Sequence, residues 1–175
     1  QLGIDLDYLN ISLLSVDGVA FDVYTNILDA LSIPWAVRTD NDISKLSNVE
    51  LWQYSGFNRA LKLSNETTVD HSPVKVDPQT TVHNGTWQQV ADKVNPHGVF
   101  VSKVDLENDF VNEHSGVILP ALGKSAPHDA VSYLQKRKAI RMRSLLKRTQ
   151  GTLDPLNTGD LVKPLIYIKN CVISD

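Results

Sequence analysis

The chain has 175 residues, a length that fits one domain of ordinary size with a buried core. Its 42% of hydrophobic and 21% of charged residues are typical of a globular protein, and no apolar run is long enough to span a membrane, so we expect neither a disordered tail nor a membrane partner. The net charge of −3 excludes a uniformly basic nucleic-acid binder, and the single cysteine, Cys171, excludes an internal disulfide and suits a reducing cytoplasm.

The first predicted elements alternate between strand and helix. After "QLGIDLDYLN", which resembles a helix end or a connector, the apolar run "ISLLSV" at 11–16 predicts a strand ending in the turn "DGVAF". Apolar residues then recur at helical spacing over 21–31, and Pro34 opens a second strand, "PWAVRT", which ends at Asp40. Strand, helix and strand with short connections are typical of a parallel sheet.

The middle of the chain is predicted to be less regular. A helix is expected from about 49 to 63, capped by Asn48. Residues 64–97 are polar and rich in proline, which predicts a long loop with one short helix around "TWQQVADKV". The run "GVFVSK" at 98–103 predicts a third strand, which is followed by the acidic stretch "VDLENDF".

The last predicted elements are helical. A long helix is expected from about 128 to 148, and a helical tail that packs on the sheet is expected within 151–175. The whole chain is therefore predicted to be a single α/β domain, a parallel sheet flanked by helices. Because it begins at Gln1 inside a connector-like stretch, we also expect it to be a piece of a longer protein.

Carboxylates follow two of the predicted strands. Asp40 and Asp42 end one strand, and Asp105 and Glu107 follow the other. Ligand sites of open α/β sheets lie beyond the carboxyl ends of the strands, so both pairs are expected at the same edge. Clustered carboxylates need a cation, and oxygen ligands select magnesium, manganese or calcium. The alternative is that these are turn aspartates and that Asp105 caps a helix.

The predicted helix at 128–148 carries seven basic residues between Lys136 and Arg148. At about 100° per residue, Lys138 falls within an apolar stripe, where an ammonium has to be paired or line a site. That stripe consists of Val131, Leu134, Met142 and Leu145. Three arginines flank it, namely Arg137, Arg141 and Arg148, whereas Lys136, Arg143 and Lys147 point the opposite way, as a solvated face does.

Four stretches together resemble the C-terminal TOPRIM domain of OLD-family (overcoming lysogenisation defect) ATP-dependent endonucleases. They are "ISLLSVDGVAFDVYTNILDALSIPWAVRTDND", "GFNRALKL", "VFVSKVDLENDF" and "AVSYLQKRKAIRMRSLLK", which span most of the chain from Ile11 to Lys147. The combination carries the resemblance, because a D-x-D alone is common. It implies a TOPRIM-like α/β fold, a divalent metal and cleavage of DNA strands.

The resemblance also implies roles for individual residues. Metal binding falls to Asp40 and Asp42, and to Glu107 with Asp105 beside it. The catalytic lysine of the family corresponds to Lys138, with Lys136 as the alternative in register. We expect Mg²⁺ or Mn²⁺ as the cofactor, with Ca²⁺ as a non-catalytic occupant, and we expect DNA to be bound through Arg137, Arg141 and Arg148.

One departure from the family pattern concerns the first strand. TOPRIM domains carry a strand that ends in a glutamate motif of the E-G-x-x-E kind, and this chain has none. We therefore expect that strand upstream of Gln1, and expect the chain by itself to have weak or absent activity. The resemblance implies ATP binding only through a preceding ATPase domain, a homo-oligomer, a cytoplasmic location, and a role in phage defence or DNA repair with a partner protein.

Two other classes of function fit the same residues. A phosphatase-like hydrolase also places a D-x-D after a strand, and it uses the first aspartate as a nucleophile. A non-catalytic oligomerisation or partner-binding module would keep the fold and lack the chemistry. The endonuclease hypothesis is the leading one, because it accounts for the second acidic element and for the lysine.

Overall fold

A computed structural model describes residues 4–16, 18–149 and 159–173. The chain divides into two compact units. The sheet unit contains the described residues up to 103 and from 163 onward, and the helical unit contains residues 104–162 without the undescribed stretch. Each unit has a hydrophobic core of its own.

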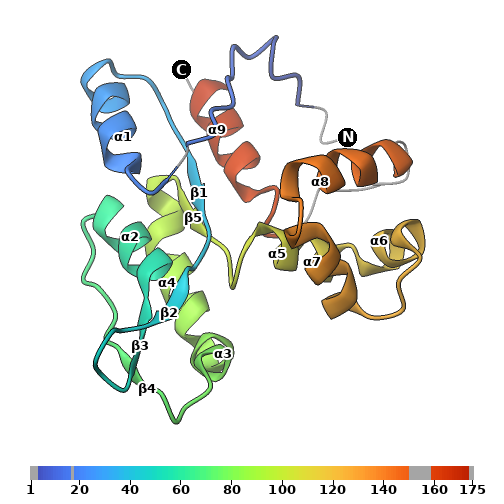
Figure 1. The fold of residues 1–175 in the computed structure, drawn as a ribbon. Coiled ribbons are helices and arrows are strands. Elements are labelled where there is room, and N and C mark those ends of the chain that lie inside the picture. The colour runs from blue at the N-terminus through green and yellow to red at the C-terminus, as the bar shows by residue number, and fades with distance from the viewer. Residues whose placement is uncertain (1–3, 17, 150–158, 174–175) are drawn as a thin grey trace. The chain divides into compact units, whose positions relative to one another are not determined.

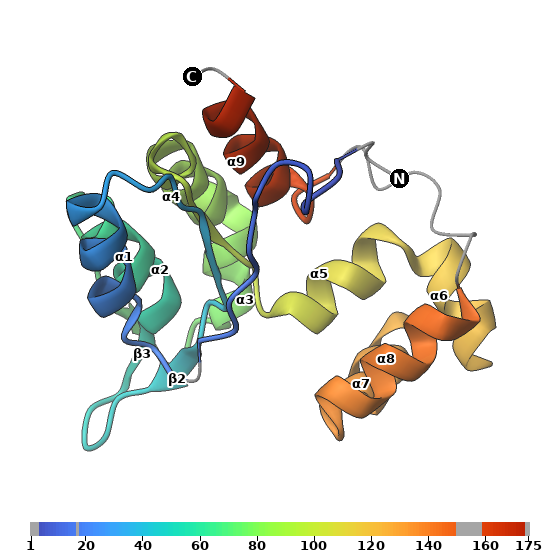
Figure 2. The ribbon, with the colours of Figure 1, turned by 90° about the horizontal axis from the view of Figure 1, so that it is seen from above.

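The sheet unit is built around a pair of parallel strands, β1 (Val37–Thr39) and β5 (Val99–Val101). Val37 pairs with Val99 and Thr39 with Val101, so both strands end at the same edge. All three residues of β5 are buried, as expected for an apolar run in a parallel sheet. Three helices contact β5, namely α2 (Ser55–Leu63), α4 (Trp87–Val94) and α9 (Lys163–Ile173) (Figures 1 and 2). The predicted mixed α/β class with a small parallel sheet flanked by helices is therefore confirmed.

The predicted helix from about 49 to 63 is wrong in its first part. Residues 43–54 form an antiparallel hairpin of β2 (Ile43–Lys45) and β3 (Leu51–Tyr54), and α2 (Ser55–Leu63) begins only afterwards. Asn48 lies in the hairpin turn with a φ of +65°, a backbone conformation that asparagine tolerates better than most residues. Asn48 is thus a turn residue, and the chain reverses where the sequence pattern predicted a helix start.

The N-terminal part of the chain confirms one predicted element and corrects another. The helix predicted over 21–31 is α1 (Phe21–Ala30), which lies beside α2 in both ribbon views (Figures 1 and 2). The strand predicted over 11–16 is wrong, because these residues pair with no other strand in the described part of the chain. A strand needs a neighbouring strand to form hydrogen bonds with its backbone N–H and C=O groups, and an apolar run in the sequence does not guarantee such a neighbour.

The predicted long loop at 64–97 is largely structured. The short strand β4 (Ser72–Pro73) joins β3, and α3 (Pro78–Thr81) follows it. A kinked segment, Val82–Thr86, in which Asn84 and Gly85 have non-helical angles, then leads into α4 (Trp87–Val94), which confirms the short helix predicted there. A final 3₁₀ turn, Asn95–His97, leads to β5. The few apolar residues of this segment are enough to fold it, because the apolar residues of α4 enter the core. The polar residues of α4 face solvent.

The core of the sheet unit lies between β1, β5, α2 and α4. The indole Nε1 of Trp87 donates a hydrogen bond to the backbone oxygen of Val101 at 2.9 Å, so the polar group of this buried ring is paired. The buried residues of this core are Tyr54, Phe57, Ala60, Leu61, Val82, Trp87, Val90, Ala91, Val94, Val99 and Val101.

The C-terminal helix α9 (Lys163–Ile173) packs on β5, as predicted for the tail. Residues 151–158 and 174–175 of the predicted tail lie outside the described residues. The rings of Tyr167 and Phe100 meet edge to face, with 5.9 Å between their centroids. Burial raises the pKa of the Tyr167 hydroxyl, and the charge and the hydrogen bond of the neighbouring Cys171 add to this shift.

The helical unit consists of α5 (Leu106–Glu113), α6 (Ser115–Leu122), α7 (Pro127–Gln135) and α8 (Lys138–Arg148). The single helix predicted over 128–148 is wrong, because Arg137 has non-helical angles of φ −151° and ψ 63° and the chain folds back there. Folding back lets α7 and α8 each place an apolar face in one core, which a straight helix could not do. That core contains Phe110, Val111, Ile118, Ala130, Val131, Leu134 and Leu145.

Candidate functional site

The first part of the site is the turn after β1, which we call the D-N-D turn (residues 40–42). Asn41 is completely buried, and its Nδ2 donates a hydrogen bond to the backbone oxygen of Lys103 at 3.0 Å. The backbone nitrogen of Ser102 donates to the backbone oxygen of Thr39, also at 3.0 Å. The end of β1 is thereby fixed to the end of β5, and an inward-facing asparagine separates the two aspartates.

The start of α2 packs directly on this turn. The backbone nitrogen of Gly56 donates to the backbone oxygen of Asn41 at 2.5 Å. A Cβ atom on Gly56 would lie 2.0 Å from the backbone oxygen of Asp40, so no other residue fits without a shift of the backbone. Helix N-termini carry partial positive charge, which favours carboxylates nearby. The glycine of "GFNRALKL" therefore brings a helix start against the D-N-D turn.

Arg59, one turn further along α2, binds Asp42 of the D-N-D turn and Thr39, the residue just before the turn. Its Nη2 lies 2.6 Å from Oδ2 of Asp42, and its Nη1 donates to Oγ1 of Thr39. The Arg59 side chain is only 15% exposed, whereas that of Asp42 is 48% exposed. Asp42 also has a φ of +51°, a left-handed conformation that aspartate adopts more readily than most residues. The exposed carboxylate is therefore held by a mostly buried cation.

Asp105, the first acidic residue after β5, is a helix cap in the helical unit. Its Oδ1 accepts hydrogen bonds from the backbone nitrogen and the Nδ2 of Asn108, both at 2.8 Å. Its Oδ2 accepts from Nε2 of Gln135 at 2.6 Å, a bond that links α5 to α7. The capping role left open by the sequence is thus present, and both oxygens of this carboxylate are engaged in it.

Glu107 and Lys138 form an ion pair within the helical unit. The Nζ of Lys138 lies 3.1 Å from Oε2 of Glu107. The Glu107 side chain is 5% exposed and that of Lys138 is 54% exposed, so the lysine is paired, as one of its two predicted alternatives required, while its side chain is half-exposed. Lys138 is the first residue of α8, and it pairs with one of the predicted acidic residues.

Two of the three predicted DNA-binding arginines are engaged inside the helical unit. The Arg141 guanidinium lies 4.0 Å from the centroid of the Tyr133 ring and also donates to the backbone oxygen of that residue. Arg148 donates to the backbone oxygen of Ala121 at 3.4 Å. Arg137, at the break between α7 and α8, is exposed.

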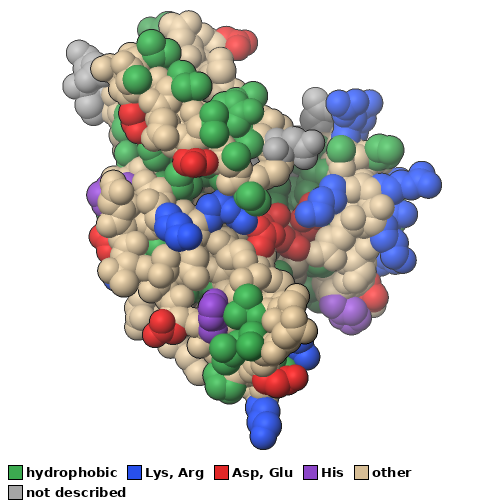
Figure 3. All heavy atoms as spheres, turned by 60° about the vertical axis from the view of Figure 1, so that its left-hand side comes forward, with side chains coloured by type: hydrophobic (Ala, Val, Ile, Leu, Met, Phe, Trp, Pro, Cys, Tyr) green, Lys and Arg blue, Asp and Glu red, His purple; other side chains and the backbone are tan. Residues whose placement is uncertain are grey.

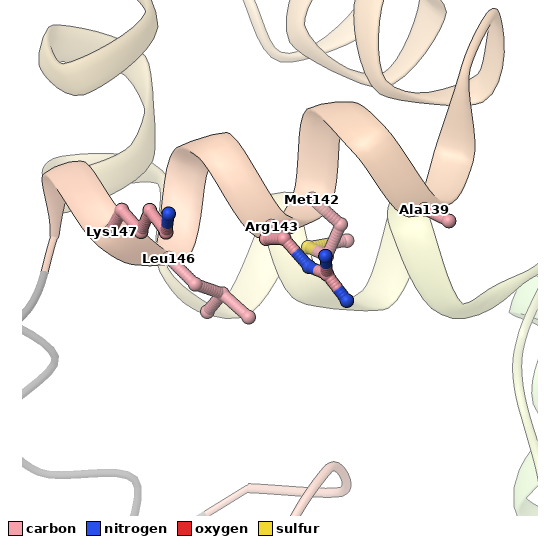
Figure 4. Close-up of a pocket in the computed structure, with 5 residues that line it drawn as sticks. All are labelled: Ala139, Met142, Arg143, Leu146 and Lys147. Atoms are coloured by element: carbon pink, nitrogen blue, oxygen red, sulfur yellow. The ribbon is translucent and has the colours of Figure 1, made fainter.

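Exposed basic side chains also cover the outer face of α8. Arg143 and Lys147 line a shallow hollow with Ala139, Met142 and Leu146, all from this one helix (Figure 4). The space-filling view shows Lys and Arg side chains gathered on the helical unit (Figure 3). This basic surface shows that the net charge of −3 is unevenly distributed over the molecule.

The predicted site residues fall into two groups. The D-N-D turn belongs to the sheet unit, and Asp105, Glu107 and Lys138 belong to the helical unit. No three His, Cys, Asp or Glu side chains gather as a metal-binding group within the residues that the structure describes. Among the helices of that same part of the chain, none is long and apolar enough to cross a membrane.

Three residues at the D-N-D turn were not anticipated from the sequence, namely Asn41, Gly56 and Arg59. Asn41 is the x of the D-x-D, and its inward orientation depends on Lys103, more than sixty positions away. Gly56 and Arg59 occur in "GFNRALKL", a stretch noted only for its resemblance. A glycine inside the predicted helix, three residues before an arginine, was the available signal.

Comparison with known proteins shows that this turn lies in a stretch shared with a known family. Residues 1–42 match the family model described as "Overcoming lysogenization defect protein-like, TOPRIM domain", and the match contains α1, β1 and the whole D-N-D turn. The resemblance to the OLD-family TOPRIM domain is confirmed. "Endonuclease GajA" of Bacillus cereus (strain VD045) is 28% identical over an alignment of 153 positions, which covers 77% of this chain. This TOPRIM-like chain spans 25% of the length of GajA.

Proposed function

We propose that this chain is the TOPRIM-like nuclease domain of an OLD-family endonuclease and that it cleaves DNA with the help of a divalent metal ion. The D-N-D turn carries the proposal. It lies at the carboxyl end of a parallel strand, where ligands of α/β sheets bind, and it lies within the stretch that matches the family model. The similarity to a relative named as an endonuclease supports the reaction class.

The oxygen atoms of the D-N-D turn fit a hard divalent cation. Asp40 and Asp42 supply carboxylates, and Asn41 Oδ1 is a buried oxygen for which the described residues provide no hydrogen-bond partner. Mg²⁺ and Mn²⁺ prefer such ligands. We assign Asp40 and Asp42 as the residues that would hold the ion. When bound, the ion would activate water and stabilise the leaving oxygen.

Glu107 and Lys138 are proposed to act in the same reaction. The Lys138 ammonium is half-exposed while its partner is buried, so it can approach a phosphate and remain anchored. There it would neutralise charge that develops on the phosphate oxygens. Glu107 would orient this lysine and contribute to metal binding. Asp105 is the weakest of the predicted ligands, because the cap of α5 and Gln135 already occupy both of its oxygens.

DNA binding is assigned to the exposed basic residues of the helical unit. Arg137 stays in this role, and Arg143 and Lys147 join it, because all three are exposed. Such contacts with the phosphate backbone bring affinity without sequence preference. Arg141 and Arg148 mainly hold the helices of the unit together, although the edges of their guanidinium groups could still reach a phosphate.

The wider assignment concerns the complete protein. We propose that both units belong to one nuclease domain that acts together with an ATPase domain, which would bind ATP, within a homo-oligomer and with a partner protein in phage defence or DNA repair. This context is what the resemblance to the OLD family implies, and the family match and the GajA similarity support that resemblance. The lone cysteine supports a cytoplasmic location.

Cleavage of supercoiled plasmid in the presence of Mn²⁺ tests the proposal in the complete protein. Asp40→Asn and Asp42→Asn should each abolish cleavage and remain folded, because asparagine keeps the shape and removes the charge. Asp42→Asn should also lower the thermal melting temperature, because it leaves the mostly buried Arg59 without its carboxylate. Asp22→Asn, at an exposed position in α1, is the matched control and should cleave normally. Normal cleavage by both turn variants would contradict the proposal, and a trapped phosphoryl-aspartate would indicate a phosphatase-like hydrolase.

A further inference from the structure

We propose that Arg59 is a positioning residue that fixes the Asp42 carboxylate for the divalent cation. This inference rests on the proposed function, and it concerns a residue that the D-x-D pattern does not contain. Arg59 comes from α2, seventeen positions beyond Asp42, and reaches back across the D-N-D turn. A guanidinium is planar and presents its donors in a fixed fork, so it can bind two acceptors at once and fix their relative position.

The two acceptors of Arg59, Thr39 and Asp42, lie on either side of Asp40 and Asn41 in the chain. Thr39 is the last residue of β1, and Asp42 is the residue after which the chain turns into β2. Arg59 therefore connects the end of the strand to the carboxylate directly. The hydrogen bonds of Thr39, Asn41 and Gly56 already fix the backbone of this turn, but none of them reaches the Asp42 side chain.

Only the side chain of Asp42 depends on Arg59 for its orientation. That side chain is about half exposed, and the described structure shows no partner for it except Arg59. An exposed aspartate without a partner exchanges between rotamers, which weakens its use as a ligand. A carboxylate has two oxygens, so the bond from Nη2 to Oδ2 leaves Oδ1 available to a cation.

Two effects of Arg59 on the cation oppose each other. Its positive charge repels a divalent ion, and its hydrogen bonds hold the ligand in place. Orientation should dominate, because partners of this kind typically contribute 10–100-fold to metal affinity. The surroundings of Arg59 also keep it there: the side chain is mostly buried, and its guanidinium lies 5.9 Å from the centroid of the Phe21 ring. It cannot move into solvent without losing these contacts.

Binding of Mn²⁺ alone to this chain, measured by titration calorimetry, tests the inference without any need for cleavage. Arg59→Ala should weaken Mn²⁺ binding by about 10–100-fold. Arg59→Lys keeps the charge and loses the fork, so its affinity should lie between those of Arg59→Ala and the parent chain. Thr39→Val removes one anchor of the guanidinium and should cause a smaller loss. Lys62→Ala, an exposed cation on the same helix, should leave binding unchanged.

The outcomes separate this inference from the proposed function. If Arg59→Ala binds Mn²⁺ as tightly as the parent chain, or more tightly, Arg59 is at most a competing counter-ion and the inference is wrong. If the parent chain itself binds no Mn²⁺, the metal site of the proposed function fails, and the inference fails with it. Thermal melting identifies a variant that does not fold. If Arg59→Ala does not fold, the Mn²⁺ affinities of Arg59→Lys and Thr39→Val test the inference in its place.

Discussion

The two units hold a carboxylate with a cation in opposite ways. In the sheet unit the cation, Arg59, is mostly buried and the carboxylate of Asp42 is exposed. In the helical unit the carboxylate of Glu107 is buried and the ammonium of Lys138 is exposed. An exposed carboxylate that is bound by a mostly buried cation can still accept a ligand on its exposed side. A buried carboxylate mainly anchors its exposed partner. The exposed member of each pair is thus the more accessible one to a metal ion or a phosphate.

The same contrast predicts unequal costs when a partner is removed. Without Lys138, Glu107 would be left buried with its charge uncompensated, which is expensive. Without Arg59, the exposed Asp42 carboxylate would remain hydrated, so the removal of Arg59 should cost little stability and should mainly leave the Asp42 side chain without a fixed orientation. Of the three predictions below, the first two test this contrast and the third tests the sheet unit apart from its ion pair, and they run from the largest expected effect on stability to the smallest.

The largest loss of stability is expected where the start of α2 packs on the backbone of the D-N-D turn. Gly56→Ala places a Cβ 2.0 Å from the Asp40 oxygen, so α2 has to move away from the D-N-D turn. We expect the free energy of unfolding to fall by about 3 kcal/mol, as for a severely overpacked site. Chemical denaturation followed by tryptophan fluorescence measures it, since Trp35, Trp52 and Trp87 all lie in the sheet unit.

Gly116→Ala is the matched control in the helical unit. Nothing lies within 4 Å of a Cβ at Gly116, an exposed position in α6. Alanine there should stabilise the chain by about 0.5–1 kcal/mol, because it restricts the unfolded chain and favours the helix. If Gly56→Ala were tolerated equally well, the start of α2 would not fix the turn, and the contrast between the units would lose its structural basis.

A smaller loss is expected from Lys138→Met, which removes the charge and keeps most of the side chain's volume. Because Glu107 is then buried without its partner, we expect a destabilisation of about 2 kcal/mol, moderated by the solvent exposure of the lysine. Circular dichroism during denaturation measures it. Adding Glu107→Gln should recover most of the loss, because it removes the uncompensated charge.

Lys136→Met provides the control for this experiment. Lys136 is exposed at the C-terminal end of α7, so the variant should differ from the parent chain by less than about 0.5 kcal/mol. In a cleavage assay of the complete protein, Lys138→Met should lose activity and Lys136→Met should keep it. The reverse result would transfer the role to Lys136, the alternative that the resemblance left open.

The elements that the sequence predicted well are those with a strong local pattern. The helix α1 and the strands β1 and β5 follow from apolar periodicity and from short apolar runs bounded by turns. The run at 11–16 has the same pattern, but it lacks a neighbouring strand in the described structure. The hairpin of β2 and β3 was missed because its turn residue, Asn48, is equally common at helix starts.

The candidate site was predictable only where it follows a strand end. Asp40 and Asp42 were identified because they terminate β1, whereas Arg59 contacts them through a fold that the pattern could not show. Lys138 was selected by helical angle, and the break at Arg137 removes that argument. Its pairing with an acidic residue was nevertheless expected, because a lysine near an apolar face requires a counter-charge.

The smallest effect is expected from Tyr167→Phe, which tests the sheet unit far from its carboxylates. Burial raises the pKa of this hydroxyl above its ordinary value of 10.0, and Cys171 adds to the shift. The unfolded chain therefore loses this proton at a lower pH than the folded chain does. The corresponding stability is fully present below about pH 10 and is lost as the pH rises toward the folded-state pKa.

Tyr167→Phe removes this titration and leaves the ring against Phe100. Near pH 7 the variant should lie within about 0.5 kcal/mol of the parent chain, and above pH 10 it should lose stability less steeply. Tryptophan fluorescence again follows the sheet unit, and Tyr8→Phe, at a largely exposed tyrosine, controls for loss of a hydroxyl elsewhere. If the free energy of unfolding falls equally steeply with pH in Tyr167→Phe and in the parent chain, the loss of stability above pH 10 arises from other groups, and the Tyr167 hydroxyl between α9 and β5 does not cause it.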